Sequence, residues 1–541
     1  MKRRHRWRRH AGALLGLVLT ATAAPERPDV LIILADDMGY SDIGCYGGEI
    51  PTPHLDALAA GGLRLTQFYN AARCSPTRAA LLTGVHPHEA GMGILAEDQV
   101  QRAPDNAGPG YRRYLAPEVM TLAELLRPAG YATALSGKWH LGFQGEEKRP
   151  LARGFDHFYG LLAGSSSYHR PAAPRPFTRG HEMLPPPEDP EFYATDAIAG
   201  DAIRFLRTRE KDEPFFLYLA FTAPHWPLHA RTEDIAKFTG RYREGWDVWR
   251  ERRFARQREL GIIPDRTRLS PRDDGVRAWS DLTTEEQGRL DFRMAVYAAQ
   301  VHRMDWNIGR VIAALRELGR LHNTLVIFLS DNGASAEPYT DAGGGVFEAV
   351  NRPGAFGLGS ARDPAGGSSY GTGWANVSNT PFRRYKSRLH EGGVRTPLIV
   401  HWPAGLHVTP GAIDHRPGDV TDLVPTVLEL AGIGRPLAHR GEPMPPLRGR
   451  SLVPRFAAGK AETDTPRDFY WEQYGHRAMR RGDWKAVRTD APDAAWELYR
   501  LDADGSELEN LAAVELAKLA EMIDAWEAWA AASQVWPVTR D

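Results

Sequence analysis

Short apolar runs alternate with amphipathic stretches along most of this 541-residue chain. The apolar runs are rich in branched and aromatic residues, which is typical of strands buried on both faces of a parallel sheet. They lie at 29–35, 131–135, 215–221, 324–330 and 398–402. Helical spacing of apolar residues indicates helices at 53–60, 120–126, 197–206 and 291–318. The alternation predicts an α/β fold with a large, mostly parallel sheet sandwiched by helices.

The last hundred residues follow a different pattern. Beyond a Pro-rich stretch at 436–454, short apolar segments indicate antiparallel strands, followed by an amphipathic helix at 514–532. The expected strands are 469–472, 476–479, 484–487 and 496–500. We therefore expect a main domain over residues 25–440 and a C-terminal α+β subdomain over 441–541, with a small antiparallel sheet and one packed helix.

Residues 1–24 have the features of a secretory signal peptide. A basic segment from Lys2 to Arg9 precedes an apolar segment from Ala11 to Leu19 and a small-residue cleavage site at Ala21–Ala23. The apolar segment is too short to span a bilayer comfortably, so we expect no stable membrane insertion. The mature chain is predicted to be exported, either periplasmic or secreted; a retained N-terminal anchor is the alternative.

Charge and cysteine content narrow the possible functions. Charged residues make up 25% of the chain and the net charge is −1, so no nucleic-acid partner is indicated. The 2 cysteines are Cys45 and Cys74. In an oxidising compartment they could form a disulfide, or Cys74 could be free for chemistry with Cys45 a buried bystander. These two interpretations exclude each other.

Hard oxygen ligands follow two of the expected strands. Asp36 and Asp37 come directly after 29–35, and Asp331 and Asn332 come directly after 324–330. In open α/β sheets, ligands bind at the carboxyl ends of the strands. One such pair is explained by ordinary turn chemistry, but a matched pair favours a metal site. With no cluster of His or thiolate ligands, calcium fits better than zinc, and magnesium is the less favoured alternative.

Cys74 begins a segment that predicts a helix ending near Gly84. Pro76 is tolerated in the first helical turn, and Arg78 lies one turn from Cys74 on nearly the same face. Unpaired backbone N–H groups and the positive end of the helix dipole point towards Cys74, so an oxyanion could bind there. A small buried cysteine at a helix start is the alternative explanation.

Basic residues follow other strands. Lys138 and His140 come after 131–135, His225 comes after 215–221, and Lys386 precedes the strand at 398–402. Each alone could be a solvated surface residue. Together with a divalent cation they are the groups that a tetrahedral oxyanion ester needs, because they stabilise charge that develops in the transition state.

Two polar or flexible regions flank these motifs. The stretch at 230–290 is rich in arginine, and we interpret it as an insertion that covers part of the site rather than a nucleic-acid patch. The glycine-dense stretch at 341–373 has no periodicity and predicts a long functional loop or lid.

The motifs resemble those of the sulfatase family, and bacterial arylsulfatases in particular. The resemblance extends over nearly the whole mature chain. The matching segments are Asp36-Asp37, Cys74-Ser75-Pro76-Thr77-Arg78, Gly137-Lys138-Trp139-His140, Ala223-Pro224-His225-Trp226-Pro227, Ser330-Asp331-Asn332-Gly333, and Lys386 ahead of Glu391-Gly392-Gly393. The resemblance implies the alkaline-phosphatase-like fold and hydrolysis of a sulfate ester, in a small molecule or a glycan.

The resemblance also implies roles for the motif residues. A maturation enzyme would convert Cys74 to formylglycine, which requires a free cysteine. Calcium would be held by the formylglycine and by four side chains, those of Asp36, Asp37, Asp331 and Asn332. Arg78 would stabilise the hydrated aldehyde, and His140 would bond the nucleophile. The sulfate would be gripped by Lys138, His225 and Lys386.

Two other functions remain compatible with the sequence. Related hydrolases on the same scaffold act on phosphonate monoesters or phosphodiesters, and some carry the Cys-x-Pro-x-Arg motif. An exported protein that binds sulfated glycans without turning them over is a second alternative. An aryl sulfate and a sulfated sugar are equally compatible as the natural substrate.

Overall fold

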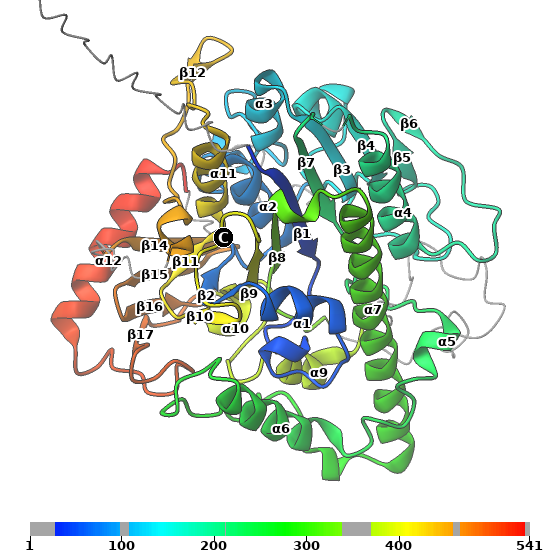
Figure 1. Ribbon diagram of the computed structural model, residues 1–541. Helices are drawn as coiled ribbons and strands as arrows, with labels where there is room; N and C mark the ends of the chain where they lie inside the picture. The colour runs from blue at the N-terminus through cyan, green and yellow to red at the C-terminus, as the bar shows by residue number, and fades with distance from the viewer. Residues whose placement is uncertain (1–26, 98–107, 211, 338–368, 458–465, 536–541) are drawn as a thin grey trace, which may run out of the picture.

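The computed structural model describes residues 27–97, 108–210, 212–337, 369–457 and 466–535 (Figure 1). Its centre is an 11-stranded sheet with the order β10-β2-β9-β8-β1-β7-β3-β4-β5-β6, in which β11 also pairs with β2. The strands are β1 Asp29–Ala35, β2 Leu63–Tyr69, β3 Ala132–Lys138, β4 His157–Leu161, β5 Phe177–Arg179, β6 Glu182–Met183, β7 Phe215–Ala220, β8 Thr324–Ser330, β9 Arg395–His401, β10 Ala412–Asp414 and β11 Gly418–Asp419. The predicted signal peptide and most of the predicted loop at 341–373 lie outside the described residues.

Strand β1 shows why the central strands are continuous apolar runs in the sequence. It pairs in parallel with β7 on one side and β8 on the other. Val30 and Ile32 pack into the core on one face of the sheet, and Leu31 and Ile33 pack into the core on the opposite face. Both faces are therefore covered, and the predicted fold with a mostly parallel sheet is confirmed. Strand β9 departs from the parallel pattern, because it is antiparallel to both β2 and β8.

Helices cover both faces of the sheet. Residues of α2, α3 and α11 pack on one face, and residues of α1, α4 and α7 pack on the other. The helices are α1 Pro53–Ala60, α2 Cys74–Thr83, α3 Leu122–Leu126, α4 Ala194–Arg207, α5 Thr232–Ile235, α6 Gly245–Glu259, α7 Thr284–Glu317, α9 Gly371–Ser378, α10 Glu391–Val394, α11 Leu423–Ala431 and α12 Leu516–Ala532. None of the helices in the described ranges combines the length and apolarity that a membrane crossing requires.

Helix α7 begins earlier than its apolar spacing predicts. The expected start was residue 291, but the helix begins at Thr284. Thr283 caps it, because its hydroxyl accepts from the Glu286 N–H while the Glu286 carboxylate accepts from the Thr283 N–H. Most residues of the first two turns are polar and only partly buried, so capping defines this end where apolar periodicity does not.

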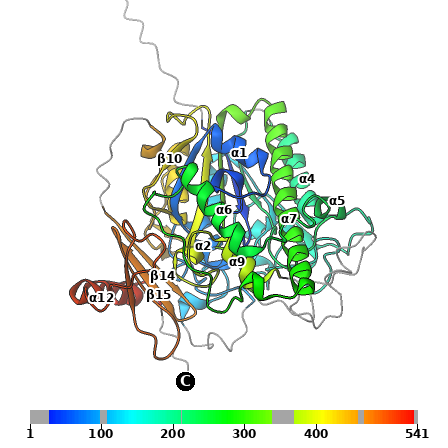
Figure 2. The ribbon, with the colours of Figure 1, turned by 90° about the horizontal axis from the view of Figure 1, so that it is seen from below.

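The C-terminal segment forms the predicted small sheet. Four antiparallel strands follow in chain order: β14 Asp468–Gln473, β15 His476–Arg481, β16 Trp484–Arg488 and β17 Glu497–Arg500. One face packs on α12 through Met479 and Trp526, and the other packs on the main domain through Trp471 and Tyr69. In Figure 2 this sheet and α12 project on the opposite side of the molecule from α4 and α7. The division of the chain at residue 440 stays a prediction.

The Arg-rich stretch at 230–290 contains α5 and α6. Its tryptophans Trp246, Trp249 and Trp279 are buried in a third core with α7 and with Trp374 of α9. The stretch is therefore anchored by aromatic packing, and two of the arginines of α6, Arg250 and Arg253, are buried as well.

Candidate active site

Helix α2 places Cys74 and Arg78 inside the molecule. All 10 residues of α2 are buried, and Cys74 is its first residue. Gly84 ends the helix in the left-handed conformation (φ 71°), with its N–H donating to the Ala80 carbonyl at 2.9 Å. Cys74 is 2% exposed and Arg78 is fully buried. The predicted helix, with Cys74 at its N-terminal end, is confirmed.

The two pairs of oxygen ligands meet because their strands are neighbours. Ala35 of β1 lies opposite Ser330 of β8, so the residues that follow leave the sheet at the same edge. The Asp37 N–H donates to Asp331 Oδ1 at 3.2 Å, and Asp37 has a left-handed backbone (φ 67°). Asn332 Nδ2 donates to Asp37 Oδ1 at 2.7 Å.

Each of the three aspartates contacts a different cationic side chain, and Arg78 also lies 3.6 Å from Asp36 Oδ2. Lys138, the last residue of β3, places Nζ 2.6 Å from Asp36 Oδ2. Lys386 Nζ lies 2.8 Å from Asp37 Oδ2. The remaining pair joins Arg78 to Asp331 Oδ2 at 2.7 Å. Three negative and three positive groups therefore share one buried centre.

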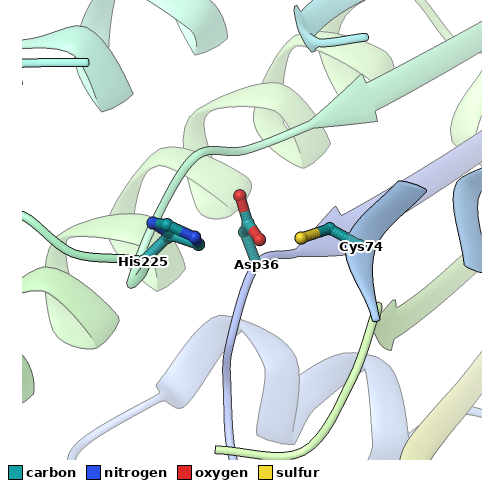
Figure 3. Close-up of side chains that lie close together, drawn as sticks. All are labelled: Asp36, Cys74 and His225. Atoms are coloured by element: carbon teal, nitrogen blue, oxygen red, sulfur yellow. The ribbon is translucent and has the colours of Figure 1, made fainter. Parts of the chain in front are cut away.

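Cys74 and His225 face the same centre. Figure 3 shows the Asp36 carboxylate between the Cys74 sulfur and the His225 ring. The ligand atoms of these three residues lie within 4.8 Å of one another, as do the carboxylates of Asp36, Asp37 and Asp331. His225 follows β7, and its Nε2 is 3.3 Å from Lys386 Nζ. Sequence motifs spread over 350 residues thus converge on one point, while their roles stay predictions.

Burial and charge change the proton affinity of these groups. Burial, together with neighbouring Asp331, raises the pKa of the Asp36 carboxyl well above its usual value. Burial would also raise the pKa of Asp37, but His225 and Lys386 hold it below its usual value. Burial lowers the pKa of His225 well below its usual value. Asp36 and Asp37 are therefore unequal: the cations beside Asp37 outweigh the effect of burial, whereas those beside Asp36 do not.

The donor set fits a hard divalent cation. Asp36 Oδ1 and Asn332 Oδ1 are both buried with no hydrogen-bond partner, which is costly for polar atoms. Both atoms are oxygens, and they belong to two of the residues that the sequence motifs select. Carboxylate and amide oxygens are the ligands that suit calcium or magnesium. A cation there would also offset the charge that raises the pKa of Asp36.

His140 lies beside the centre but pairs with a different residue. Its Nε2 hydrogen-bonds the carboxylate of Glu97, and burial lowers the pKa of the imidazole. Glu97 was not expected from the sequence, because an isolated glutamate far from any motif carries no local signal. His140 and Glu97 are distant in the sequence and come into contact only when the chain folds.

The structure also shows the state of both cysteines and the position of two tryptophans. Cys45 and Cys74 are both free and buried, so the alternative of a disulfide between them is wrong. Trp139 and Trp374 are fully buried core residues, with indole N–H groups that donate to backbone carbonyls.

A mostly parallel α/β sheet with a buried cluster of charged side chains at its strand ends is the architecture of the alkaline-phosphatase-like fold. The sulfatase family model matches residues 28–433, and the model of the N-sulphoglucosamine sulphohydrolase C-terminal region matches residues 382–525. This chain therefore belongs to the sulfatase family. The predictions of that family and of an enzyme of the sulfuric ester hydrolase type are confirmed.

Individual relatives and structures agree with this assignment. An uncharacterized sulfatase of Schizosaccharomyces pombe is 40% identical over 532 residues, which cover 93% of each chain. An arylsulfatase of Klebsiella aerogenes is 38% identical over 451 residues, which cover 80% of this chain and 92% of the relative. The crystal structure of Ps i-CgsB in complex with k-i-k-neocarrahexaose superposes with a TM-score of 0.64 at 25% identity, covering 94% of each chain.

Proposed function

We propose that this protein hydrolyses sulfate esters with a formylglycine nucleophile made from Cys74 and a calcium ion held by Asp36, Asp37, Asp331 and Asn332. One observation carries the proposal. Three aspartates, three cationic side chains and the first residue of a buried helix surround one centre, in which two oxygen atoms have no partner. Such a centre can accept a divalent cation and the tetrahedral anion of a sulfate ester together.

The proposed formylglycine would supply the nucleophile, and the proposed calcium ion would supply part of the positive charge. A formylglycine at position 74 would supply, as its hydrated aldehyde, an oxygen for attack at sulfur, and a calcium ion held by the four oxygen ligands would offset charge on the sulfate oxygens. The side chains of the protein do the rest. Arg78, held by Asp331 and by the Lys138 carbonyl, would stabilise the nucleophile at the helix start. Lys138 and Lys386 would turn from their aspartate partners towards sulfate oxygens.

The leaving oxygen needs a proton, and two groups are placed to give it. His225 Nε2 and Lys386 Nζ are 3.3 Å apart, so either can deliver the proton while the other holds the sulfate. Asp37 raises the pKa of Lys386 against the effect of burial, which keeps the lysine charged. His140 is the base proposed for release of the product.

We propose an aryl sulfate or a sulfated carbohydrate as substrate. The named arylsulfatase relative supports the first. The second is supported by the structural neighbour solved in complex with k-i-k-neocarrahexaose. The basic and apolar segments of residues 1–24 support export to the periplasm or beyond, and fractionation of cells that express the full chain tests this.

The deciding experiment measures sulfate release from an aryl sulfate by the wild type, Cys74→Ala and Cys45→Ala. Cys45 is the matched control, because it is the other buried free cysteine. We expect Cys45→Ala to retain the wild-type kcat and Cys74→Ala to lose turnover. An aryl phosphonate and a phosphodiester run in parallel, and mass spectrometry of the tryptic peptide reports the state of Cys74.

Each outcome has a definite meaning. Full activity of Cys74→Ala overturns the formylglycine nucleophile. Turnover of the phosphonate or diester, without release of sulfate from a panel of aryl and sugar sulfates, overturns the sulfate ester assignment. Binding of sulfated glycans by a chain that retains an unmodified Cys74 and turns over no ester would identify a binding protein instead.

A further inference from the structure

A buried glutamate–histidine pair lies beside the first turn of α2. The Nε2 atom of His140 hydrogen-bonds Glu97 Oε2, and Glu97 Oε1 accepts from the Gly164 N–H. His140 is 2% exposed, and the Glu97 side chain is 21% exposed. Glu97 therefore has both carboxylate oxygens engaged, one by the imidazole and one by the backbone.

The backbone holds the imidazole in place on three sides. His140 has a left-handed backbone conformation (φ 60°), and its N–H donates to the Leu162 carbonyl at 3.1 Å. Its own carbonyl accepts from the Ser75 hydroxyl at 2.8 Å, which ties it to the residue after Cys74. A Cβ added to Gly164 would lie 2.9 Å from the imidazole Nε2, so the ring packs directly on this glycine. The ring has little freedom to turn.

The pairing decides which ring nitrogen carries the proton. Burial would raise the pKa of Glu97, but His140, the Gly164 N–H and Arg175 lower it to about 2. The carboxylate is therefore ionised and can only accept hydrogen bonds. Nε2 must then be the donor. In a neutral imidazole Nδ1 is left as the acceptor, and Nδ1 is buried with no hydrogen-bond partner.

We propose that Glu97 is a positioning residue that holds His140 as the Nε2–H tautomer, so that Nδ1 accepts a hydrogen bond from the hydroxyl of the nucleophile at Cys74. The assignment rests on the proposed function. Ser75 bonds the His140 carbonyl, and Lys138 and Arg78 are among the charges that act on the imidazole, which places His140 at the cationic side of the centre. Glu97 acts through the histidine and contacts no reacting atom.

The test compares Glu97→Gln with Glu97→Asp. A glutamine keeps the shape of the side chain, but only one of its two terminal atoms can accept, so the Gly164 N–H and the imidazole compete for it. When the glutamine oxygen accepts from Gly164, its amide NH₂ faces the imidazole, so His140 Nε2 must accept and the proton moves to Nδ1. This Nδ1–H tautomer cannot accept a hydrogen bond at Nδ1. We expect kcat to fall roughly 10- to 100-fold with KM changed less than about 3-fold, as is typical when a carboxylate partner of a functional histidine is removed. Glu97→Asp should recover part of the loss.

Glu472 and His88 provide the matched control. Glu472 Oε2 lies 2.7 Å from His88 Nε2, both side chains are 2% exposed, and His88 Nδ1 also lacks a partner. This pair packs between aromatic rings, Tyr111 and Trp529, and has no part in the centre. Glu472→Gln therefore makes the same chemical change elsewhere, and we expect wild-type kcat per folded molecule.

Two further measurements make the result decisive. In the double variant Glu97→Gln/His140→Ala, kcat should be no lower than in His140→Ala alone, because Glu97 acts through the histidine. Nitrogen-15 spectra of histidine-labelled protein, assigned by the signals lost in His140→Gln, should show Nε2 protonated in the wild type and Nδ1 protonated in Glu97→Gln. The spectra need no substrate, so they distinguish failure of this inference from failure of the sulfatase assignment.

An Nδ1–H tautomer in the wild type overturns the proposal. So does a wild-type kcat in Glu97→Gln, measured on whichever ester the wild type hydrolyses fastest. Multiplication of the two single-variant losses in the double variant also overturns it, since the two residues would then act independently.

Discussion

The molecule contains two clusters of fully buried charge that are built from similar side chains. One is the centre at the ends of β1 and β8. The other, which we term the interface cluster, joins the main sheet to the C-terminal sheet and consists of Glu391, Arg395, Arg480, Lys485 and Glu507. Lys485 lies 2.7 Å from one oxygen of Glu391, and the other oxygen accepts from Tyr69 at 3.0 Å.

The two clusters differ in how completely one central acid of each, Glu391 and Asp36, is paired. Burial would raise the pKa of Glu391, but Lys485 and Arg395 lower it to about 2. Asp36 has its pKa raised and one oxygen without a partner. In the interface cluster both Glu391 oxygens are occupied by protein groups, as a structural network requires. At the centre formed by the strand ends, Asp36 Oδ1 and Asn332 Oδ1 have no hydrogen-bond partner. This arrangement is typical of a binding site and not of a purely structural network.

The largest effect is expected from Asp36→Asn, which tests the centre. The amide removes a ligand and a negative charge, and we expect kcat to fall roughly 10³-fold, a loss that corresponds to about 4 kcal/mol of transition-state stabilisation. The melting temperature should stay within a few degrees of the wild type, because the ionised carboxyl is already unfavourable there. Steady-state kinetics and calorimetry check both. A collapse of stability with wild-type kcat in the folded fraction would place Asp36 among structural charges.

Glu391→Gln tests the interface cluster and should reverse this pattern. Removing the charge leaves Lys485 and Arg395 buried beside a neutral group. We expect the free energy of unfolding to fall by about 3–5 kcal/mol, as when one partner of a buried ion pair is lost. Activity per folded molecule should stay within about threefold of the wild type. Urea titration and kinetics at low temperature measure these quantities, and a selective loss of kcat would show that the cluster serves the reaction.

Removal of divalent cations sharpens the comparison further. A chelator should lower the melting temperature of the wild type, and calcium added at 100 times its dissociation constant should restore about 2.7 kcal/mol of stability. Asp36→Asn should show little response at the same concentration, while Glu391→Gln should respond like the wild type. Equal calcium responses in all three proteins would contradict a cation site at Asp36. A larger response to magnesium would favour that ion.

The smallest effect concerns a buried carboxylate that has no cationic partner in the described part of the chain. Asp305 of α7 accepts from the backbone N–H groups of His54 and Leu55, and burial raises its pKa to about 7. The folded state thus keeps a proton that the unfolded chain has lost above pH 4, so stability falls as the pH rises from 4 to 7. Asp305→Asn should flatten this fall by an amount on the order of 2 kcal/mol. Thermal melts between pH 5 and 8 measure it, and parallel curves for both proteins would contradict the raised pKa.

Local sequence signals predicted much of the fold and most of the centre. The apolar run of β1 indicates burial on both faces, and the rule that ligands bind at strand ends brings Asp36 and Asp331 together. The helix that starts at Cys74 was predicted from Pro76 and Gly84. These features depend on residues close in sequence, so no knowledge of the three-dimensional structure was needed to expect them.

The features that were missed depend on contacts between distant segments. Glu97 meets His140 across 43 residues, and no spacing or motif marks it. The antiparallel direction of β9 appears only in its pairing with β2 and β8, which are both distant from it in the sequence. The early start of α7 did have a signal, the Thr283–Glu286 capping box, but apolar periodicity alone does not detect it.

Because Cys74 is buried in the folded chain, its modification has to precede the completion of folding. Arg73, directly before Cys74, donates to Ser387, which lies 314 residues further along the chain, and β2 pairs with β9 on the same side of the sheet. At roughly 5–20 residues per second, a ribosome needs about 15–60 s to make the segment that completes this packing. Any enzyme that modifies Cys74 must reach it before the chain closes over it, within this interval or while the finished chain is still unfolded. A variant that folds faster could therefore be less active, because fewer of its molecules would be modified in time.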